Sequence, residues 1–338
     1  MRVAELPTPA LVVDTVALTR NLDTMGVALP GVRLRPHVKA HKCTALAIEQ
    51  ANRGHVGFTG ATPRELFGLA RAGLTADLLL ANESVDDHRL HALAECGARV
   101  TVAVDSEATV EAAARSGIKE VLIDVNVGIP RCGVAVDGAG ALADLARARG
   151  LTVRGTMGYE GHAVLVPDRA ERAALTDQSM ATLAAAHEAV GGPILSGGGT
   201  GTYDVNTVAT EIQAGSYALM DTAYAKLDIP FTVALAVVAT VIHANPKWSV
   251  ADCGLKALGM DHGNPTIAGA QVMFCSDEHV TFTPDAPLRV GDRVLVYPAH
   301  VDPTVAYHDA LHLADGPSTD ATVIDRWAVD LRGWDQPG

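Results

Sequence analysis

The sequence has few of the features that mark secreted, membrane-spanning or nucleic-acid-binding proteins. Its five cysteines, at positions 43, 96, 132, 253 and 275, form no Cys-x-x-Cys pair. An odd, scattered set argues against a disulfide framework or a cysteine zinc site and is typical of reduced thiols in the cytoplasm. Positive charge is also scarce, since 26 Lys and Arg face 39 Asp and Glu, giving a formal net charge of -13. We therefore expect a cytoplasmic protein with neither nucleic acid nor a membrane surface as a partner.

Long apolar runs are absent too. The first residues include Glu5, Pro7 and Pro9 and lack the apolar core of a signal peptide. The most apolar stretch, residues 231–244, is shorter than the roughly 20 residues that a membrane-spanning helix needs. We interpret it as a buried strand.

From residue 33 to 221, short β-rich runs alternate with longer helical runs that are rich in Ala and Leu. Strands are predicted at 33–40, 55–60, 77–82, 99–105, 120–127, 151–159, 193–196 and 216–221. Helices are predicted at 44–53, 63–72, 87–96, 107–116, 139–149 and 169–190. This alternation predicts an α/β fold of the (β/α)8 TIM-barrel type. A doubly wound open sheet with a similar strand count is the alternative.

The pattern changes after residue 221. Short β-like runs at 233–244, 270–274, 280–282, 293–296 and 321–327 are separated by turns rich in Gly, Pro and Asp. They predict a mainly antiparallel β-domain, and the run 10–13 is expected to pair with it. We therefore place the barrel at residues 14–230 and the β-domain at 231–338, with strand 1–13 added.

Three ionisable side chains share one face of the first predicted barrel strand, because strand side chains alternate: Arg35, His37 and Lys39. Lys39 is the last of the three, at the strand's carboxyl end, where barrel active sites lie. Desolvation beside Arg35 and His37 would favour the neutral amine that imine formation with an aldehyde requires. A strand-end lysine paired with a carboxylate is the alternative, and Lys42, past the strand, is the rival lysine.

A glycine-rich run, SGGGTGT at 196–202, follows the seventh predicted strand. Its glycines let several backbone N–H groups converge, and the hydroxyls of Ser196, Thr200 and Thr202 add donors. The next segment contains Ser216 and Tyr217, at the eighth predicted strand. Phosphate sites in barrels commonly occupy the loops after strands seven and eight. The run matches neither the dinucleotide-binding nor the Walker spacing. It predicts a phosphate cradle, with a structural turn or a sugar-phosphate site as alternatives.

Several motifs together resemble those of the D-threonine aldolase and D-serine dehydratase group of alanine-racemase-like, fold-type III pyridoxal-phosphate enzymes. They are TPALVVD near the start, RPHVKAHK at 35–42, SGGGTGTYD at 196–204, EIQAGSYALMD at 211–221, VADCGLKALGMD at 250–261 and GDRVLVYPAHVD at 291–302. The resemblance covers almost the whole chain. It implies a barrel followed by a β-domain, in a homodimer.

The resemblance also implies roles for individual residues. Lys39 matches the lysine that holds pyridoxal 5'-phosphate as a Schiff base, and the segment Gly199, Thr200 and Gly201 matches the phosphate loop. Arg131, in DVNVGIPRCG, resembles the arginine near the cofactor ring, with an ion pair on a neighbouring strand as the alternative. In MGYEGH, Tyr159 resembles a residue that packs on or binds the cofactor, and His162 a general base.

Two further residues, His300 and Asp302 in PAHVD, resemble the metal-binding pair of the aldolases, where the dehydratases have His-x-Cys. Two residues apart on an extended segment, they would face the same side and bind one divalent ion. Nitrogen and oxygen ligands favour manganese or magnesium, and zinc is an alternative.

The implied reaction is the cleavage of a β-hydroxy-D-amino acid such as D-threonine to glycine and an aldehyde. The metal would lower the pKa of the substrate's β-hydroxyl, and His162 would remove its proton. A D-serine-type dehydratase, a racemase and a non-catalytic cofactor carrier are the alternatives. The sequence leaves the substrate side chain, the β-carbon stereochemistry and the metal open.

Overall fold

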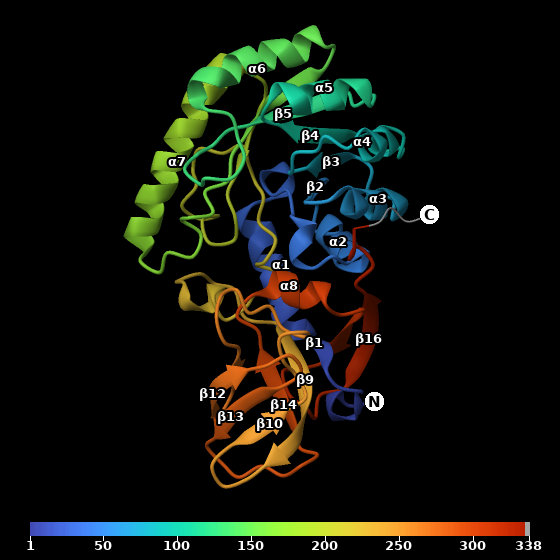
Figure 1. Cartoon of the computed structure of the whole chain (residues 1–338), viewed down its shortest axis with the longest axis vertical. Coiled ribbons are helices and arrows are strands. Elements are labelled where there is room, and N and C mark those ends of the chain that lie inside the picture. Colours follow the sequence, from blue (N-terminus) through green and yellow to red (C-terminus); the bar gives the residue numbers. More distant parts are fainter. Residues whose placement is uncertain (335–338) are drawn as a thin grey trace. The chain divides into compact units, whose positions relative to one another are not determined.

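The computed structural model describes residues 1–334, which divide into two compact units. The first, here called the antiparallel unit, comprises residues 1–24, 40–45 and 216–330. The second, the barrel unit, comprises residues 25–39, 46–215 and the described residues after 330. Both units combine segments from distant parts of the sequence, as the colours in Figure 1 show.

The barrel unit contains a seven-stranded parallel sheet in the order β2-β3-β4-β5-β6-β7-β8. Strands that are consecutive in the sequence are neighbours in the sheet, as repeated β-α units require. The strands are β2 (Gly57–Gly60), β3 (Asp77–Leu80), β4 (Val100–Val104), β5 (Glu120–Asp124), β6 (Thr152–Met157), β7 (Ile194–Gly197) and β8 (Glu211–Ile212). All residues of β2 and β4 are buried, as in a sheet covered on both faces.

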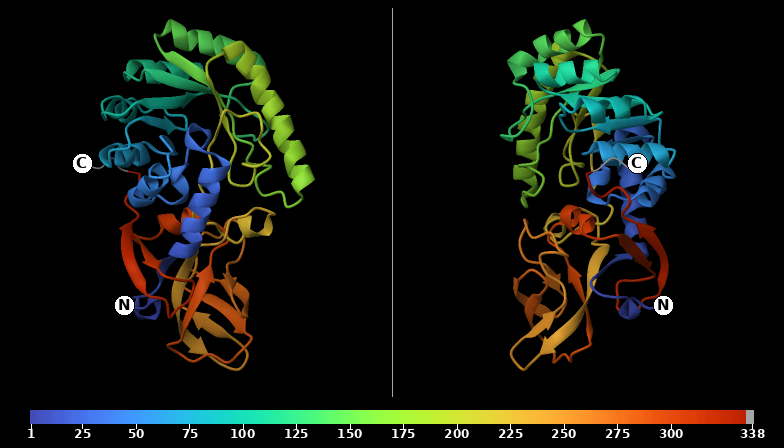
Figure 2. Two further views of the ribbon diagram at one scale, coloured as in Figure 1. Left: turned by 180° about the vertical axis from the view of Figure 1, so that it is seen from behind. Right: turned by 45° about the vertical axis from the view of Figure 1, so that its right-hand side comes forward.

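Helices alternate with these strands, and in Figure 1 α3 to α6 lie beside the strands that they connect. The helices within this unit are α3 (Pro63–Arg71), α4 (Asp87–Ala94), α5 (Glu107–Arg115), α6 (Val136–Ala148) and α7 (Arg169–Val190), whereas α1 (Thr15–Ala28) and α2 (Thr44–Ala51) each include residues of both units. Helix α7 has the bounds predicted from the sequence and forms the long rod in both views of Figure 2. It begins where the Asp168 carboxylate accepts the Glu171 N–H, and it ends at Gly191, whose φ is +70°.

The first predicted barrel strand, 33–40, is wrong as a regular strand. Residues 34–37 make only isolated bridges, from Leu34 to Ile212 of β8 and from His37 to Thr59 of β2. Pro36 has no N–H to donate, so this segment cannot form a full ladder. A 3₁₀ turn, Val38–Ala40, follows. The two bridges nevertheless join β8 to β2 and close the ring, so the predicted (β/α)8 barrel is confirmed.

The eighth predicted strand is also wrong in place. Residues 216–221 form turns, and the eighth barrel strand is the two-residue β8, which lies a few residues earlier and pairs with β7. Two residues give too short an apolar run for the sequence pattern to reveal.

The amino ends of the barrel strands carry a buried network of ion pairs. Arg35 contacts the carboxylates of Glu211 at 2.8 Å and Asp77 at 2.6 Å. Arg154 of β6 reaches the same Asp77 at 2.6 Å and lies 3.5 Å from Glu120 of β5. The sequence suggested that Arg35 lies beside Lys39, and this prediction is wrong. It is neutralised by carboxylates at the opposite ends of the strands.

The antiparallel unit has a nine-stranded sheet in the order β10-β13-β12-β11-β14-β9-β1-β15-β16, and a further β10–β9 pairing closes six of the strands into a small barrel. All pairings except the parallel β1–β15 pair are antiparallel. The strands are β1 (Ala10–Asp14), β9 (Leu235–Ala244), β10 (Ser249–Ala251), β11 (Thr266–Ile267), β12 (Ala270–Cys275), β13 (Val280–Pro284), β14 (Arg293–Tyr297), β15 (Ala310–Ala314) and β16 (Val323–Ala328). The predicted pairing of the N-terminal strand with this domain is confirmed.

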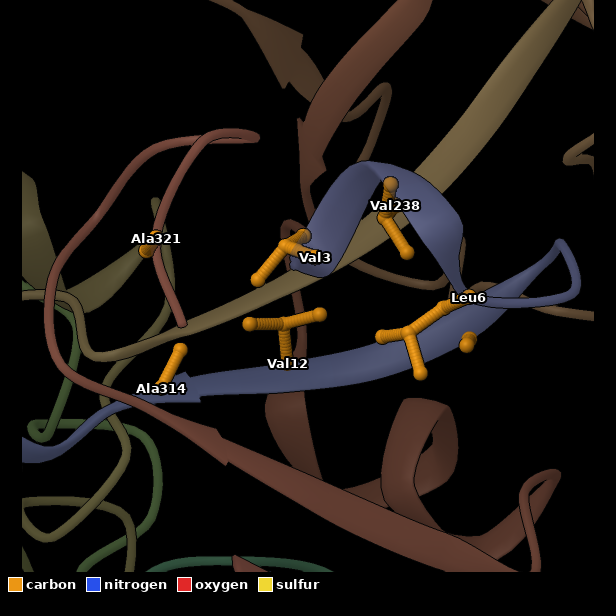
Figure 3. Close-up of a cluster of buried hydrophobic side chains, with 7 residues drawn as sticks. Val3, Leu6, Val12, Val238, Ala314 and Ala321 are labelled. Atoms are coloured by element: carbon orange, nitrogen blue, oxygen red, sulfur yellow. The ribbon is translucent and has the colours of Figure 1, made fainter. Parts of the chain in front are cut away.

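Both chain ends contribute to one apolar cluster of this unit. Figure 3 shows Val3, Leu6 and Val12 from the N-terminal segment against Val238 of β9, with Ala314 and Ala321 from the C-terminal part. The sequence reading missed β10, β11, β15 and the short helix α8 (Val301–Ala306). Within residues 1–334, no helix is both long and apolar enough to cross a membrane.

Candidate active site

Lys39, Tyr159 and Arg131 come together at the carboxyl end of the barrel strands. The Lys39 Nζ atom lies 5.6 Å from the centre of the Tyr159 ring, and the Arg131 guanidinium carbon lies 5.6 Å from the same ring. Tyr159 follows β6, and Lys39 lies in the 3₁₀ turn after the closing segment. The structure thus brings together three of the residues selected from the sequence, around one half-buried aromatic ring.

The loop that carries Arg131 is fixed from both sides. Its end returns to β5, since the Val134 N–H donates to the Asp124 carbonyl at 2.9 Å. The Gly133 N–H donates to the Asp105 carboxylate at 3.2 Å. Arg131 itself is exposed, and its guanidinium group lies over the Tyr159 ring, while its charge also acts on the Asp124 carboxyl group of β5.

The predicted phosphate cradle follows β7, and Ser196, Gly199, Thr200 and Gly201 are all buried. A side chain at Gly201 would overlap the carbonyl oxygen of Val164. A Cβ at Gly199 would lie 3.5 Å from Tyr159, which places the cradle beside the same ring. Glycine therefore brings the backbone close to neighbouring groups here.

The polar groups of the cradle differ in whether they already make hydrogen bonds within the protein. The Ser196 hydroxyl accepts a hydrogen bond from Gln213 at 2.9 Å. The Thr202 hydroxyl is held by Glu160 at 2.8 Å, so it is not the phosphate donor that the sequence suggested. Among residues 1–334, no acceptor is described for the Gly201 N–H.

Ser216 and Tyr217 belong to the antiparallel unit. Tyr217 is fully buried, and its ring centre lies 5.7 Å from that of Phe231. The Ser216 carbonyl accepts a hydrogen bond from the Met220 N–H at 2.7 Å. Their roles in cofactor binding remain predictions.

His162 is exposed and packs beside α7. Its Nε2 atom lies 3.4 Å from the Ser179 hydroxyl, which in turn donates to the Val127 carbonyl at 3.0 Å. A Cβ at Gly128 would lie 2.8 Å from the His162 ring, so this loop also borders the histidine. The role of His162 as a base remains a prediction, and Ser179 is a contact that the sequence did not reveal.

The residues present fit pyridoxal 5'-phosphate. The site offers an amine at Lys39, an aromatic face at Tyr159, a cation at Arg131 and a buried glycine turn at Gly199–Gly201, all in one unit. A planar aldehyde that carries a phosphate needs these groups: an amine to bind covalently, a ring face to pack against and N–H donors for the anion. Lys42 lies past the turn with a φ of +47°.

His300 and Asp302 are close together in the antiparallel unit, with the His300 Nε2 atom 3.7 Å from an Asp302 carboxylate oxygen. The expected extended segment is wrong for Asp302. His300 is extended, with φ -140° and ψ 119°, but helix α8 begins at Val301 and includes Asp302. The Asp221 carboxylate accepts the Val301 N–H at 3.0 Å and so fixes the start of this helix.

Asp261 and His262 complete a cluster around His300. The Asp261 carboxylate lies 2.7 Å from Nδ1 of His300, and the ring of His262 stacks on that of His300 at 3.9 Å. Burial lowers the pKa of His300, but the carboxylates of Asp302 and Asp261 outweigh it and raise the pKa above its usual value.

This donor set fits a divalent cation. Asp261, His262 and His300 each offer a ligand atom within 4.8 Å of the others. Two arrangements are therefore open to an ion: all three of these residues bind it, or Asp261 holds Nδ1 of His300 and orients the ring while Nε2, which faces Asp302, binds it. The sequence reading missed Asp261 and His262, because they lie far from His300 in the chain.

The parallel barrel, the antiparallel domain and the site around Lys39 are those of a pyridoxal-phosphate enzyme with the alanine-racemase-like fold. Comparison with known proteins agrees with this class. The chain belongs to the family described as alanine racemase, N-terminal domain, whose model matches residues 13–222. A second model, described as putative serine dehydratase domain, matches residues 234–314.

Three relatives are similar over nearly the whole chain. D-threonine aldolase of Arthrobacter sp. is 33% identical, over 98% of this chain and 94% of the relative. 3-hydroxy-D-aspartate aldolase of Paracoccus denitrificans (strain Pd 1222) is 32% identical, over 90% of this chain and 88% of the relative. The crystal structure of D-threonine aldolase from Filomicrobium marinum has a TM-score of 0.90 and 34% identity, over 97% of this chain and 96% of that chain.

Proposed function

We infer that this chain is a pyridoxal-phosphate-dependent aldolase that cleaves β-hydroxy-D-amino acids to glycine and an aldehyde. Its similarity to two aldolases of such substrates supports the reaction. The observation that carries the inference is the convergence of Lys39, Arg131 and the Gly199 turn on the ring of Tyr159.

Each of these residues has a task that its chemistry permits. Lys39 would hold the cofactor covalently through its amine, and the glycine turn would bind the phosphate through backbone N–H groups. When bound, pyridoxal phosphate supplies the conjugated system that takes up the electrons of the broken carbon–carbon bond. Tyr159 would pack against the cofactor, and Arg131 would stabilise negative charge near it. His162 would accept the proton of the substrate's β-hydroxyl.

His300 and Asp302 would hold a divalent ion, with Asp261 orienting the imidazole of His300. One nitrogen and carboxylate oxygens suit manganese or magnesium better than metals that prefer thiolates, and zinc is the competitor. The ion's chemistry is that of a Lewis acid toward a hydroxyl oxygen. We further propose a homodimer, as the family resemblance implies, which size-exclusion chromatography with light scattering would test. The scattered cysteines favour the cytoplasm as its location.

A substrate panel tests the proposed reaction. The purified enzyme, with pyridoxal phosphate and manganese, is given D- and L-threonine, D-serine and 3-hydroxy-D-aspartate, and aldehyde, glycine and keto acid are measured. We expect aldehyde and glycine from D-isomers, with activity lost on chelation and restored by manganese. Keto acid and ammonia without aldehyde would identify a dehydratase. Exchange at Cα alone would identify a racemase, and cleavage of L-isomers only would reverse the stereochemical assignment.

A further inference from the structure

Glu160 is a fully buried carboxylate next to Tyr159 in the chain. Three groups of one loop donate to it. The Gly198 N–H donates at 3.1 Å, the Thr202 hydroxyl at 2.8 Å and the Asn206 amide at 3.3 Å. All three belong to the segment that begins with the glycine-rich turn.

A buried anion beside a phosphate site needs a physical reason. Its charge disfavours a second anion nearby, and burying it costs free energy unless donors surround it. Here the donors come entirely from the loop that is to bind the phosphate. Hydrogen bonds to a charged group are the stronger ones, so this carboxylate fixes the loop more firmly than a neutral acceptor would.

The hydrogen bonds also show which N–H donors of the turn already have an acceptor and which do not. The Thr202 hydroxyl gives its proton to Glu160 and, with its lone pair, accepts the Gly199 N–H at 3.1 Å. Glu160 therefore occupies the Gly198 N–H directly and the Gly199 N–H through Thr202. The Gly201 N–H, for which no acceptor is described within residues 1–334, is left at the far side of the turn.

The glycines of the turn lie in positions that only glycine fits well, and their flexibility gives the brace its purpose. Gly198 has a φ of +78°, and its position beside Ile212 leaves a side chain no room. Gly201 passes against the Val164 carbonyl. Glycine loses more conformational entropy on ordering than any other residue, so hydrogen bonds from a fixed partner are needed to offset this cost.

We propose that Glu160 is a positioning residue for cofactor binding: it holds the Gly198–Gly201 turn in the conformation that presents the Gly201 N–H to the cofactor's phosphate. The inference rests on the proposed function. Two adjacent residues would thus act on two parts of one ligand. Tyr159 would pack against the ring, and Glu160 would position the loop that binds the phosphate.

The test compares two ligands that differ only in the phosphate. Full-length protein, freed of cofactor by dialysis against hydroxylamine, is titrated with pyridoxal 5'-phosphate and with pyridoxal, and binding is followed by absorbance. In the Glu160→Gln variant, one of the two accepting oxygens becomes an NH2 group, so at least one donor of the loop loses its acceptor. We expect the Kd for pyridoxal 5'-phosphate to rise about tenfold or more, and the Kd for pyridoxal to stay unchanged.

A matched control is Glu65→Gln. Glu65 is also fully buried in the barrel unit and accepts a backbone N–H, from Ala61 at 2.6 Å. This variant should leave the ratio of the two Kd values as in the wild type. If Glu160→Gln binds pyridoxal phosphate equally well or more tightly, charge repulsion outweighs positioning and the proposal is wrong. An equal loss for both ligands would likewise overturn it.

A second pair of variants keeps the test decisive if Glu160→Gln does not fold. Thr202→Val removes the hydroxyl between Glu160 and Gly199 and should weaken pyridoxal phosphate selectively, whereas Thr202→Ser should restore binding. Equal affinities in the valine and serine variants would contradict the proposal. Failure of the proposed function has a different signature: wild-type protein would form no borohydride-reducible adduct at Lys39 with either ligand.

Discussion

The two ends of the parallel barrel shift the pKa of a buried aspartate in opposite directions. At the amino ends, Asp77 lies between Arg35 and Arg154. Burial raises the pKa of Asp77, but hydrogen bonds and charges from both arginines outweigh it and lower the pKa to about 2. At the carboxyl ends, Asp124 is buried beside Glu83, and burial together with that second carboxylate raises its pKa to about 8.

This contrast separates stability from function within one unit. The amino ends pair each buried charge with an opposite one, which is the arrangement of a structural core. The carboxyl ends leave like charges together and set cations around one aromatic ring, which is typical of a binding or catalytic site. The following predictions test whether the two ends can be disturbed independently.

Replacing Lys39 by alanine should have the largest effect, at the carboxyl end alone. Loss of the amine removes covalent cofactor attachment, so we expect activity to fall by about 1000-fold or more, with the unfolding midpoint of the cofactor-free protein nearly unchanged. Aldehyde release and the borohydride-reduced adduct are the measurements. Lys42→Ala is the control and should keep the adduct, and an adduct in Lys39→Ala would identify the wrong lysine.

Asp77→Ala should affect the amino ends and stability. It deprives Arg35 and Arg154 of a shared buried partner, which should cost about 3 kcal/mol of unfolding free energy. Urea denaturation measures this, with Asp87→Ala, in the exposed pair with Arg115, as a control that should cost less than about 1 kcal/mol.

The same carboxylate predicts a dependence on acid. Because the folded pKa of Asp77 lies below its unfolded value of 3.8, its contribution is present above pH 3.8 and is lost as the pH falls toward 2. Wild-type protein should lose this part of its stability in that window, and Asp77→Ala should not. Identical acid profiles would show that the ion pairs contribute nothing.

Asp261→Asn extends the comparison to a carboxylate of the antiparallel unit. It keeps an acceptor for His300 but removes the charge, so we expect manganese affinity to fall about 10- to 100-fold. Isothermal titration calorimetry measures this. Asp277→Asn, an exposed carboxylate of the same unit, is the control. Unchanged affinity in Asp261→Asn would show that Asp261 does not support the site.

The prediction for Asp124→Asn depends on pH. A folded pKa of about 8, above the unfolded 3.8, means that the carboxyl group's contribution is full below pH 3.8 and is lost as the pH rises through 8. The asparagine variant lacks this loss, so it should gain stability relative to wild type as the pH rises from 5 to 8, by up to about 1.4 kcal/mol per pH unit. Parallel stability profiles would contradict the raised pKa.

The sequence predicted the regular parts of the fold better than its closures. Apolar and Ala/Leu-rich runs revealed helix α7 and strands β3 to β7, because these features are local. The closing segment around Pro36 and the two-residue β8 are defined by partners far along the chain, which no local pattern contains. Residue 35 shows the same limit, since its partners are 42 and 176 residues away.

The site shows a similar division. Lys39, Tyr159, Arg131, His300 and Asp302 could be selected because motifs and the family resemblance mark them. Glu160 and Asp261 lie within two of the quoted motifs but were not selected, since their roles depend on contacts with residues 38 and 39 positions away. Asp302 was correctly placed near His300, but the turn into α8 was missed because the helix is so short.

The position of β1 has a consequence for synthesis of the chain. Its two neighbours in the sheet are β9 and β15, so this strand has no partner until residues beyond Leu235 have left the ribosome. A nascent or truncated polypeptide ending before Ala310 would lack β15, so one edge of β1 would have no neighbouring strand to pair with. Such an open edge invites pairing with other molecules. Premature termination should therefore yield aggregates rather than a smaller working enzyme.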